Sequence, residues 1–93
     1  MKYKTKDSFQ LKTVAGEPIV VARGPAAIDF GAMLVLNEAG AFMWKLLEEG
    51  CTKEVLAGKL SEKYGIPAPQ AQTDADAFVQ KCLSEDLLDT VED

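Results

Sequence analysis

The fold is decided by LVLNEAGAFMWKLLEEG, residues 34–50, where a strand-like run passes directly into a helical pattern. The residues 33–36 are all apolar, and Asn37 follows them as a good helix N-cap, because its side-chain oxygen can accept a first-turn amide. Glu38 lies where the helix dipole favours an acid, and Gly50 predicts the end of the helix. The stretch therefore predicts a strand that leads without a loop into a helix.

Two further helices are predicted downstream. Thr52 caps the second helix and Gly65 ends it, while Pro69 fits a first helical position of the third, which is expected to run to about Asp86. Leu87-Leu88 is expected to pack back before an acidic tail. Apolar residues recur at helical spacing in all three helices. The three stripes are Ala39, Phe42, Met43, Leu46 and Leu47; Val55, Leu56, Leu60 and Tyr64; and Ala71, Ala75, Phe78, Val79 and Cys82.

Upstream, the sequence favours strands. The stretch FQLKTVAGEPIVVARG, residues 9–24, alternates, breaks at Gly16 and Pro18, and resumes with β-branched residues, which predicts a hairpin. A loop over 23–31 and a third strand at about 32–36 follow. The order β-β-β-α-α-α predicts an α+β domain spanning residues 1–93, with a small three-stranded antiparallel sheet followed by three helices. These are also the parts of a winged helix-turn-helix, in permuted order.

The chemistry of the chain disfavours catalysis. With 47% hydrophobic and 27% charged residues it has an ordinary globular composition, but no histidine, so Ser-His, Cys-His and imidazole–metal sites are excluded. The cysteines, Cys51 and Cys82, are 31 positions apart and are interpreted as reduced thiols. We expect neither an enzyme nor a bound cofactor or metal. Because no signal peptide or apolar span is recognisable, we expect a cytoplasmic protein without a membrane partner.

A winged-helix DNA-binding regulator is the alternative function that this order of elements allows. A recognition helix should offer lysine and arginine to phosphates. The third helix and its end carry Asp74, Asp76, Glu85 and Asp86 against Lys81 alone. These charges disfavour nucleic acid as a partner.

The strand 32–36 leaves a different possibility open. Met33 and Val35 are expected to face one way and Leu34 and Leu36 the other, and one of these sets must meet the helices. An uncovered strand edge is a pairing hazard unless something uses it, and a peptide can add there as another strand. The residues alone do not separate this from coverage by the chain itself or by a second copy, so monomer and homodimer both stay open.

A resemblance favours peptide addition and leaves the oligomeric state open. Two segments of the chain resemble the PqqD-like family: LNEAGAFMWKLLEEGCTKEVLAGKLSEKYG (36–65) and DADAFVQKCLSEDLL (74–88). Members of this family look like Leu-Asn-Glu-Thr, followed by a helix with an aromatic pair, a Gly, a helix that ends in Tyr-Gly, and Asp-Val-x-x-Phe-Leu. Ala39 departs from the usual Thr and Ala77 from the usual Val. The matching positions are Leu36, Asn37, Glu38, Gly40, Trp44, Leu47, Gly50, Tyr64, Gly65, Asp76 and Phe78.

This resemblance implies a recognition element for ribosomally made and modified peptides (RiPPs). Such an element is a non-catalytic module that binds the leader of a precursor peptide and presents it to a modifying enzyme, often a radical S-adenosylmethionine (radical SAM) protein, as in pyrroloquinoline quinone (PQQ) or related biosynthesis. The leader is expected to add to the third strand, in a groove walled by the third helix. Trp44 is expected to pack under the sheet or, alternatively, to touch the partner enzyme. The implied peptide-binding residues are Ala32, Met33, Leu34, Val35, Leu36, Ala75, Phe78, Val79 and Cys82.

Overall fold

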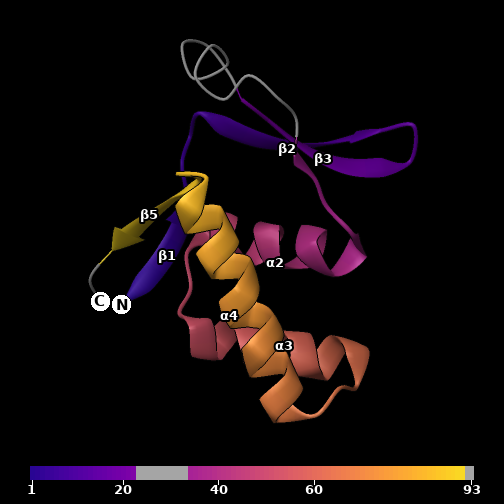
Figure 1. Ribbon diagram of the computed structural model, residues 1–93, viewed down its shortest axis with the longest axis vertical. Coiled ribbons are helices and arrows are strands. Elements are labelled where there is room, and N and C mark those ends of the chain that lie inside the picture. Colours follow the sequence, from indigo (N-terminus) through magenta and orange to yellow (C-terminus); the bar gives the residue numbers. More distant parts are fainter. Residues whose placement is uncertain (23–33, 92–93) are drawn as a thin grey trace.

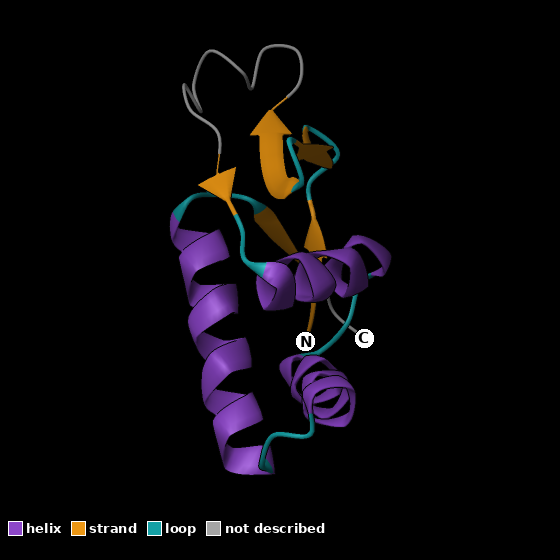
Figure 2. Ribbon diagram, turned by 90° about the vertical axis from the view of Figure 1, so that its right-hand side faces the viewer, coloured by secondary structure: helices purple, strands orange, loops and turns teal. Residues whose placement is uncertain are grey.

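Three helices and two small antiparallel sheets make up the part of the chain that the computed structural model describes, residues 1–22 and 34–91 (Figure 1). The α2 helix lies between the sheet β2-β3-β4 and α3, and α4 runs alongside both (Figures 1 and 2). This arrangement confirms the predicted α+β class. The elements are β1 (Lys2–Thr5), β2 (Phe9–Val14), β3 (Glu17–Ala22), β4 (Leu34–Val35), α2 (Glu38–Glu49), α3 (Lys53–Tyr64), α4 (Ala68–Ser84) and β5 (Leu88–Val91).

The predicted hairpin is formed by β2 and β3, with Phe9 opposite Ala22 and Val14 opposite Glu17. Its two-residue turn places Ala15 at φ 52° and Gly16 at φ 81°. Positive φ at both central positions matches the right-handed twist of the flanking strands, which explains the tight connection. Strand β4 then pairs antiparallel with β3 and completes the sheet, as predicted for a third strand.

A second sheet, β1 with β5, was not predicted. Lys2 lies opposite Val91 and Thr5 opposite Leu88, so the two ends of the described chain lie side by side (Figure 1). The expected packing of Leu87 and Leu88 is confirmed, and the acidic tail that follows them continues as strand β5 to Val91. Both strands are short and mostly exposed, and each finds its partner more than 80 positions away, so neither carries a strong local pattern.

The helix boundaries follow the predicted caps. The Asn37 side chain accepts a hydrogen bond from the Gly40 amide at 2.7 Å, and Thr52 accepts one from the Val55 amide at 3.1 Å. Gly50 ends α2 at φ 89°, a backbone conformation that glycine adopts without strain. The third helix ends at Ser84, slightly earlier than expected. The start of α2 is thus fixed directly behind β4.

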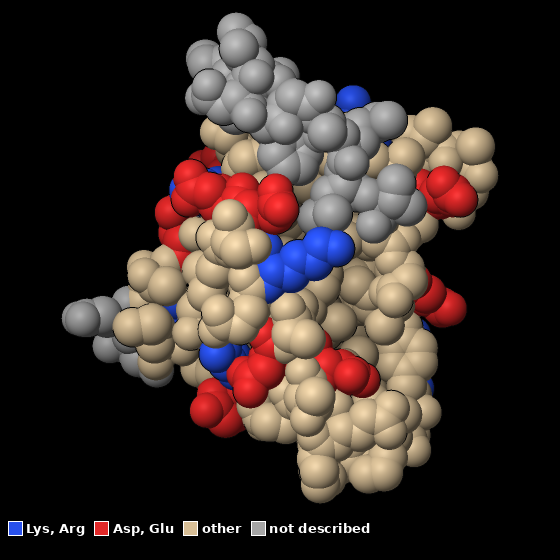
Figure 3. All heavy atoms as spheres, viewed as in Figure 1, with Lys and Arg blue, Asp and Glu red and all other residues tan. Residues whose placement is uncertain are grey.

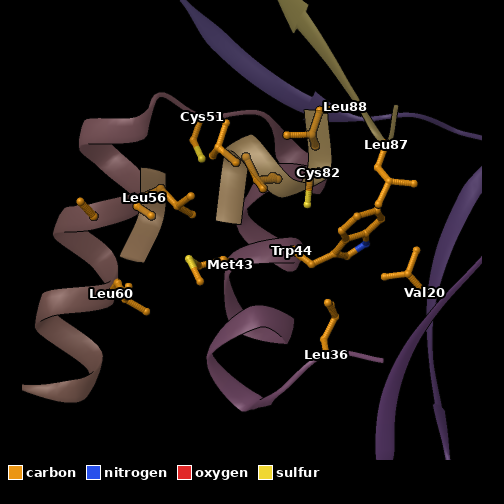
Figure 4. Close-up of a cluster of buried hydrophobic side chains, with 14 of the residues drawn as sticks. Val20, Leu36, Met43, Trp44, Cys51, Leu56, Leu60, Cys82, Leu87 and Leu88 are labelled. Carbon is orange, nitrogen blue, oxygen red and sulfur yellow. The ribbon is translucent and has the colours of Figure 1, made fainter. Parts of the chain in front are cut away.

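The core lies between the helices and the inner face of β3. Trp44, Leu47 and Val20 are completely buried, and α4 contributes four side chains that are also completely buried (Figure 4). The burial of Trp44 agrees with the interpretation that it packs under the sheet. Two members of the predicted second stripe do not join the core: Val55 is 48% exposed and Tyr64 36% exposed. They lie beside the true contact line of α3, which Leu56, Ala57 and Leu60 form.

Candidate functional site

The β4 strand lies at the edge of its sheet, and among the described residues nothing pairs with its second side. The Leu36 amide donates a hydrogen bond to the Pro18 carbonyl of β3 at 2.9 Å. Hydrogen-bonded and non-bonded pairs alternate along an antiparallel ladder. Val35, which lies opposite Ile19 one position earlier, therefore directs its N–H and C=O away from β3. These two groups form an open edge at which another strand can pair.

A groove of about 410 Å³ lies between the end of this strand, the first turns of α2, and α4. Figure 2 shows α4 running beside β4 and the start of α2. We call this hollow the α2–α4 groove. Its walls combine apolar and polar surface in similar amounts, with one carboxylate and one ammonium group on the α4 side. The lining residues are Leu36, Asn37, Ala39, Gly40, Met43, Asp74, Ala77, Phe78 and Lys81.

The Phe78 ring closes the groove against the start of α2. A Cβ added at Gly40 would lie 3.3 Å from Phe78 Cε1 and 3.1 Å from Asn37 Oδ1. The absence of a side chain at Gly40 therefore lets the ring approach the α2 backbone. Because Phe78 is only partly buried, part of its surface is available to a bound molecule. The ring offers an apolar contact of large area there.

The predicted peptide-binding residues fall into four groups. Ala32 and Met33 lie outside the described residues. Leu34 and Val35 form β4. Leu36 and Phe78 come together in the α2–α4 groove, although Leu36 is only 7% exposed. The remaining three, all 0% exposed, lie in the core behind the groove wall: Ala75, Val79 and Cys82.

The groove face of α4 differs from the face that the sequence singled out. Asp74, Ala77, Phe78 and Lys81 follow helical spacing and lie one step around the helix from the core stripe. The sequence pattern did not identify Asp74, Ala77 and Lys81 as site residues. Asp74 and Lys81 are charged, and Ala77 is small. Their own i, i+3, i+4, i+7 spacing was the available signal, since it places them on one side of α4.

A titratable cysteine lies directly behind the groove wall. Burial raises the pKa of the Cys82 thiol to about 12, so this group stays neutral behind the groove wall. No cluster of acidic or cysteine side chains suitable for a metal ion occurs within residues 1–22 and 34–91. Within the same ranges, no helix is both long and apolar enough to cross a bilayer.

Figure 3 shows the molecular face that carries α4, with acidic side chains at several points and a basic side chain extending across its middle, beside a broad uncharged area. Lys53 and Asp76 form an ion pair of 3.2 Å that joins α3 to α4. Within its bounds α4 carries Asp74 and Asp76 against Lys81. This face offers little to nucleic-acid phosphates, which need several positive contacts.

Comparisons with known proteins find a matching family profile and solved structures of similar fold. The family profile described as "Coenzyme PQQ synthesis protein D (PqqD)" matches residues 10–88. No curated protein matches the sequence. One similar solved structure is described as "TbiB1 in Complex with the TbiA(beta) Leader Peptide", with 22% identity, a TM-score of 0.76, and coverage of 97% of this chain and 99% of that one. Another, "Lasso peptide synthetase B1 complexed with the leader peptide", has 16% identity, a TM-score of 0.75, and coverage of 95% and 98%.

Proposed function

Because the chain belongs to the PqqD family, we propose that it binds the leader of a ribosomally made precursor peptide and presents it to a modifying enzyme. The protein itself is non-catalytic, and the covalent chemistry belongs to its partner. Two proteins of similar fold are each described in complex with a leader peptide, which supports the same role here. The module would thus contribute affinity and position to a reaction that it does not catalyse.

The observation that carries this proposal is the open backbone edge at Val35 beside the α2–α4 groove. A peptide that adds as a strand gains main-chain hydrogen bonds from such an edge, and the groove next to it selects side chains. The Leu36 amide is already bonded to Pro18, so Val35 is the described β4 position whose N–H is directed at the incoming strand. Backbone pairing and side-chain selection are thereby available at one place.

The proposed site is a revision of the sequence-based residue set. Leu34 and Val35 keep their role through the backbone, and Ala32 and Met33, which lie outside the described residues, stay in the proposed set. Leu36 and Phe78 supply apolar surface together with Ala77. The buried residues Ala75, Val79 and Cys82 would act indirectly, by holding α4 against the core so that the groove keeps its width.

The partner enzyme and the compartment are part of the proposal. We expect a radical SAM protein or another RiPP-modifying enzyme, in a pathway that makes PQQ or a related peptide product. Family membership supports both this role and a cytoplasmic location, where ribosomal precursors are made. The reading frames next to the gene identify the candidates, because a short peptide gene and a modifying-enzyme gene should lie there.

A calorimetric titration tests the function. The short precursor encoded beside the gene should bind the full chain, and its leader alone should bind equally well. Ala77→Arg places a long charged side chain in the groove and should abolish binding. Gln80→Arg is the matched control, because Gln80 is exposed on the same helix but does not line the groove. Equal affinities of the two variants would contradict the proposed site.

The DNA-binding alternative has a separate test. Duplex DNA titrated at low salt should show only weak association, and added salt should remove it. Tight, sequence-specific binding would overturn the peptide-binding function.

A further inference from the structure

The α2–α4 groove carries two charged side chains, Asp74 and Lys81, and both come from α4. Both are exposed, and neither forms an ion pair with any residue of the described ranges. The nearby carboxylate of Asp76 differs, because it is engaged by Lys53 at 3.2 Å. The groove therefore presents one negative and one positive group that no residue of ranges 1–22 and 34–91 engages in an ion pair.

These two charges are separated along the groove. They lie seven positions apart, which corresponds to about 10.5 Å along an α-helix. An extended peptide advances about 3.3 Å per residue, so this distance corresponds to about three residues. Because strand side chains alternate between faces, two peptide residues that both face α4 must be two or four positions apart. Ala77 and Phe78 lie between the charges and present apolar surface.

The direction of the chain fixes the order of the two contacts. Figure 2 shows that β4 leads down to the start of α2, whereas α4 runs up toward β5, so β4 and α4 have opposite directions. Every strand pair in the described sheets is antiparallel. A peptide that adds antiparallel to β4 then runs in the same direction as α4. Its residue beside Asp74 precedes its residue beside Lys81.

We infer that the bound peptide carries a basic residue facing Asp74 and, two or four positions later, an acidic residue facing Lys81. This inference rests on the proposed function and adds a rule for which peptides the groove accepts. With the four-residue spacing, the middle residue facing α4 meets Ala77 and Phe78 and is apolar. A peptide with the reverse order of charges places like charges together at both ends of the groove, which disfavours it.

The test uses a phage-displayed library of random peptides, selected on the wild-type full chain and on the double variant Asp74→Lys/Lys81→Glu. Both positions are exposed, so the double variant should fold, and its circular dichroism and urea midpoint check this. Selection on the wild type should enrich base-before-acid peptides at spacing two or four. Selection on the double variant should enrich the opposite order.

Synthetic peptides then give the affinities. One enriched base-before-acid peptide and its charge-reversed copy are titrated into both proteins. Each mismatched charge should weaken binding by about fivefold, the upper size for an exposed ion pair, and salt should reduce the difference. Ala77→Arg reports whether the selected peptides occupy the groove.

The possible outcomes distinguish a failure of the charge-order rule from a failure of the proposed leader-binding function. Peptides that bind, that Ala77→Arg excludes, and that show no charge order would overturn the inference and leave the proposed function standing. A selection that yields no peptide sensitive to Ala77→Arg, with a precursor leader that also fails to bind, would overturn both.

Discussion

The two neighbouring faces of α4 differ sharply, although they belong to one helix. One face packs into the core, and its side chains are completely buried: Ala71, Ala75, Val79 and Cys82. The other face borders the α2–α4 groove and mixes an acid, a small residue, an aromatic ring and a base: Asp74, Ala77, Phe78 and Lys81. Regular apolar spacing marks the face that the chain uses for itself. The face that is free to meet a ligand has the less regular composition.

The largest expected effect comes from placing the same charge on each face in turn. Val79→Asp buries an unpaired carboxylate in the core and should cost about 4 kcal/mol of folding stability. Ala77→Asp places the same group on the exposed groove face and should change stability by about 0.5 kcal/mol or less, while it weakens binding of a leader peptide. Urea unfolding measures the first quantity and calorimetry the second. Similar stability losses in the two variants would remove the distinction between the faces.

Phe78 lies at the boundary between the two faces of α4, so its truncation should lower both folding stability and leader binding. Phe78→Ala removes the ring that closes the groove against Gly40 and should lower leader affinity by about 2 kcal/mol. Because the ring is only partly buried, the loss of folding stability should be smaller than for a core phenylalanine. Leu83→Ala, at a partly buried α4 position outside the groove lining, is the control. If Leu83→Ala weakened binding as much as Phe78→Ala does, the ring would have no special role.

The buried face should also be visible in the pH dependence of stability. The pKa of Cys82 is raised by burial from 9.0 to about 12, so above pH 9 the unfolded chain loses this proton while the folded chain keeps it. Stability is therefore retained below pH 9 and falls as the pH rises toward 12. The thiol should account for a loss of about 1 kcal/mol between pH 8 and pH 10.

Cys82→Ala isolates this contribution, because the other titrating groups are common to both proteins. Urea unfolding at pH 8 and pH 10 should show a smaller decrease in the variant than in the wild type, even though the variant is less stable at both. Equal decreases would mean that the thiol is accessible to water.

The smallest expected effect concerns the width of the groove. Alanine at Gly40 gains about 1 kcal/mol of helix propensity but brings a Cβ within 3.3 Å of Phe78 Cε1. The two contributions should nearly cancel in stability, while the displaced ring weakens leader binding by about threefold, or roughly 0.6 kcal/mol. Gly58→Ala is the control, because nothing lies within 4 Å of a Cβ there. Unchanged leader affinity in Gly40→Ala would show that the position of the Phe78 ring does not determine the width of the groove.

Local signals made much of the fold predictable. The caps at Asn37 and Thr52, the glycine at position 50 and the hairpin turn are each decided by a few adjacent residues, and all were correctly predicted. The β1–β5 sheet was missed because its pairing depends on contacts between the two ends of the chain. Val55 and Tyr64 were wrongly predicted to be core residues. The α3 helix has few apolar residues, so their spacing does not determine which side of the helix packs against the core.

The candidate site was only partly predictable. The strand, its edge and Phe78 follow from the sequence pattern together with the family resemblance. The orientation of α4 does not, because a rotation by one residue step exchanges a core position for a groove position. Asp74 and Lys81 acquire meaning only once α2 is packed beside them, and no local pattern contains that information.

The most direct test of the central claim is amide hydrogen exchange at two adjacent residues. The Val35 amide is directed at the open edge of β4, whereas the Leu36 amide is already bonded to Pro18 at 2.9 Å. Residue-resolved NMR exchange should therefore show that the precursor leader strongly slows exchange at Val35 and changes Leu36 much less. Binding without added protection at Val35, or with equal gains at both amides, would contradict strand addition at this edge.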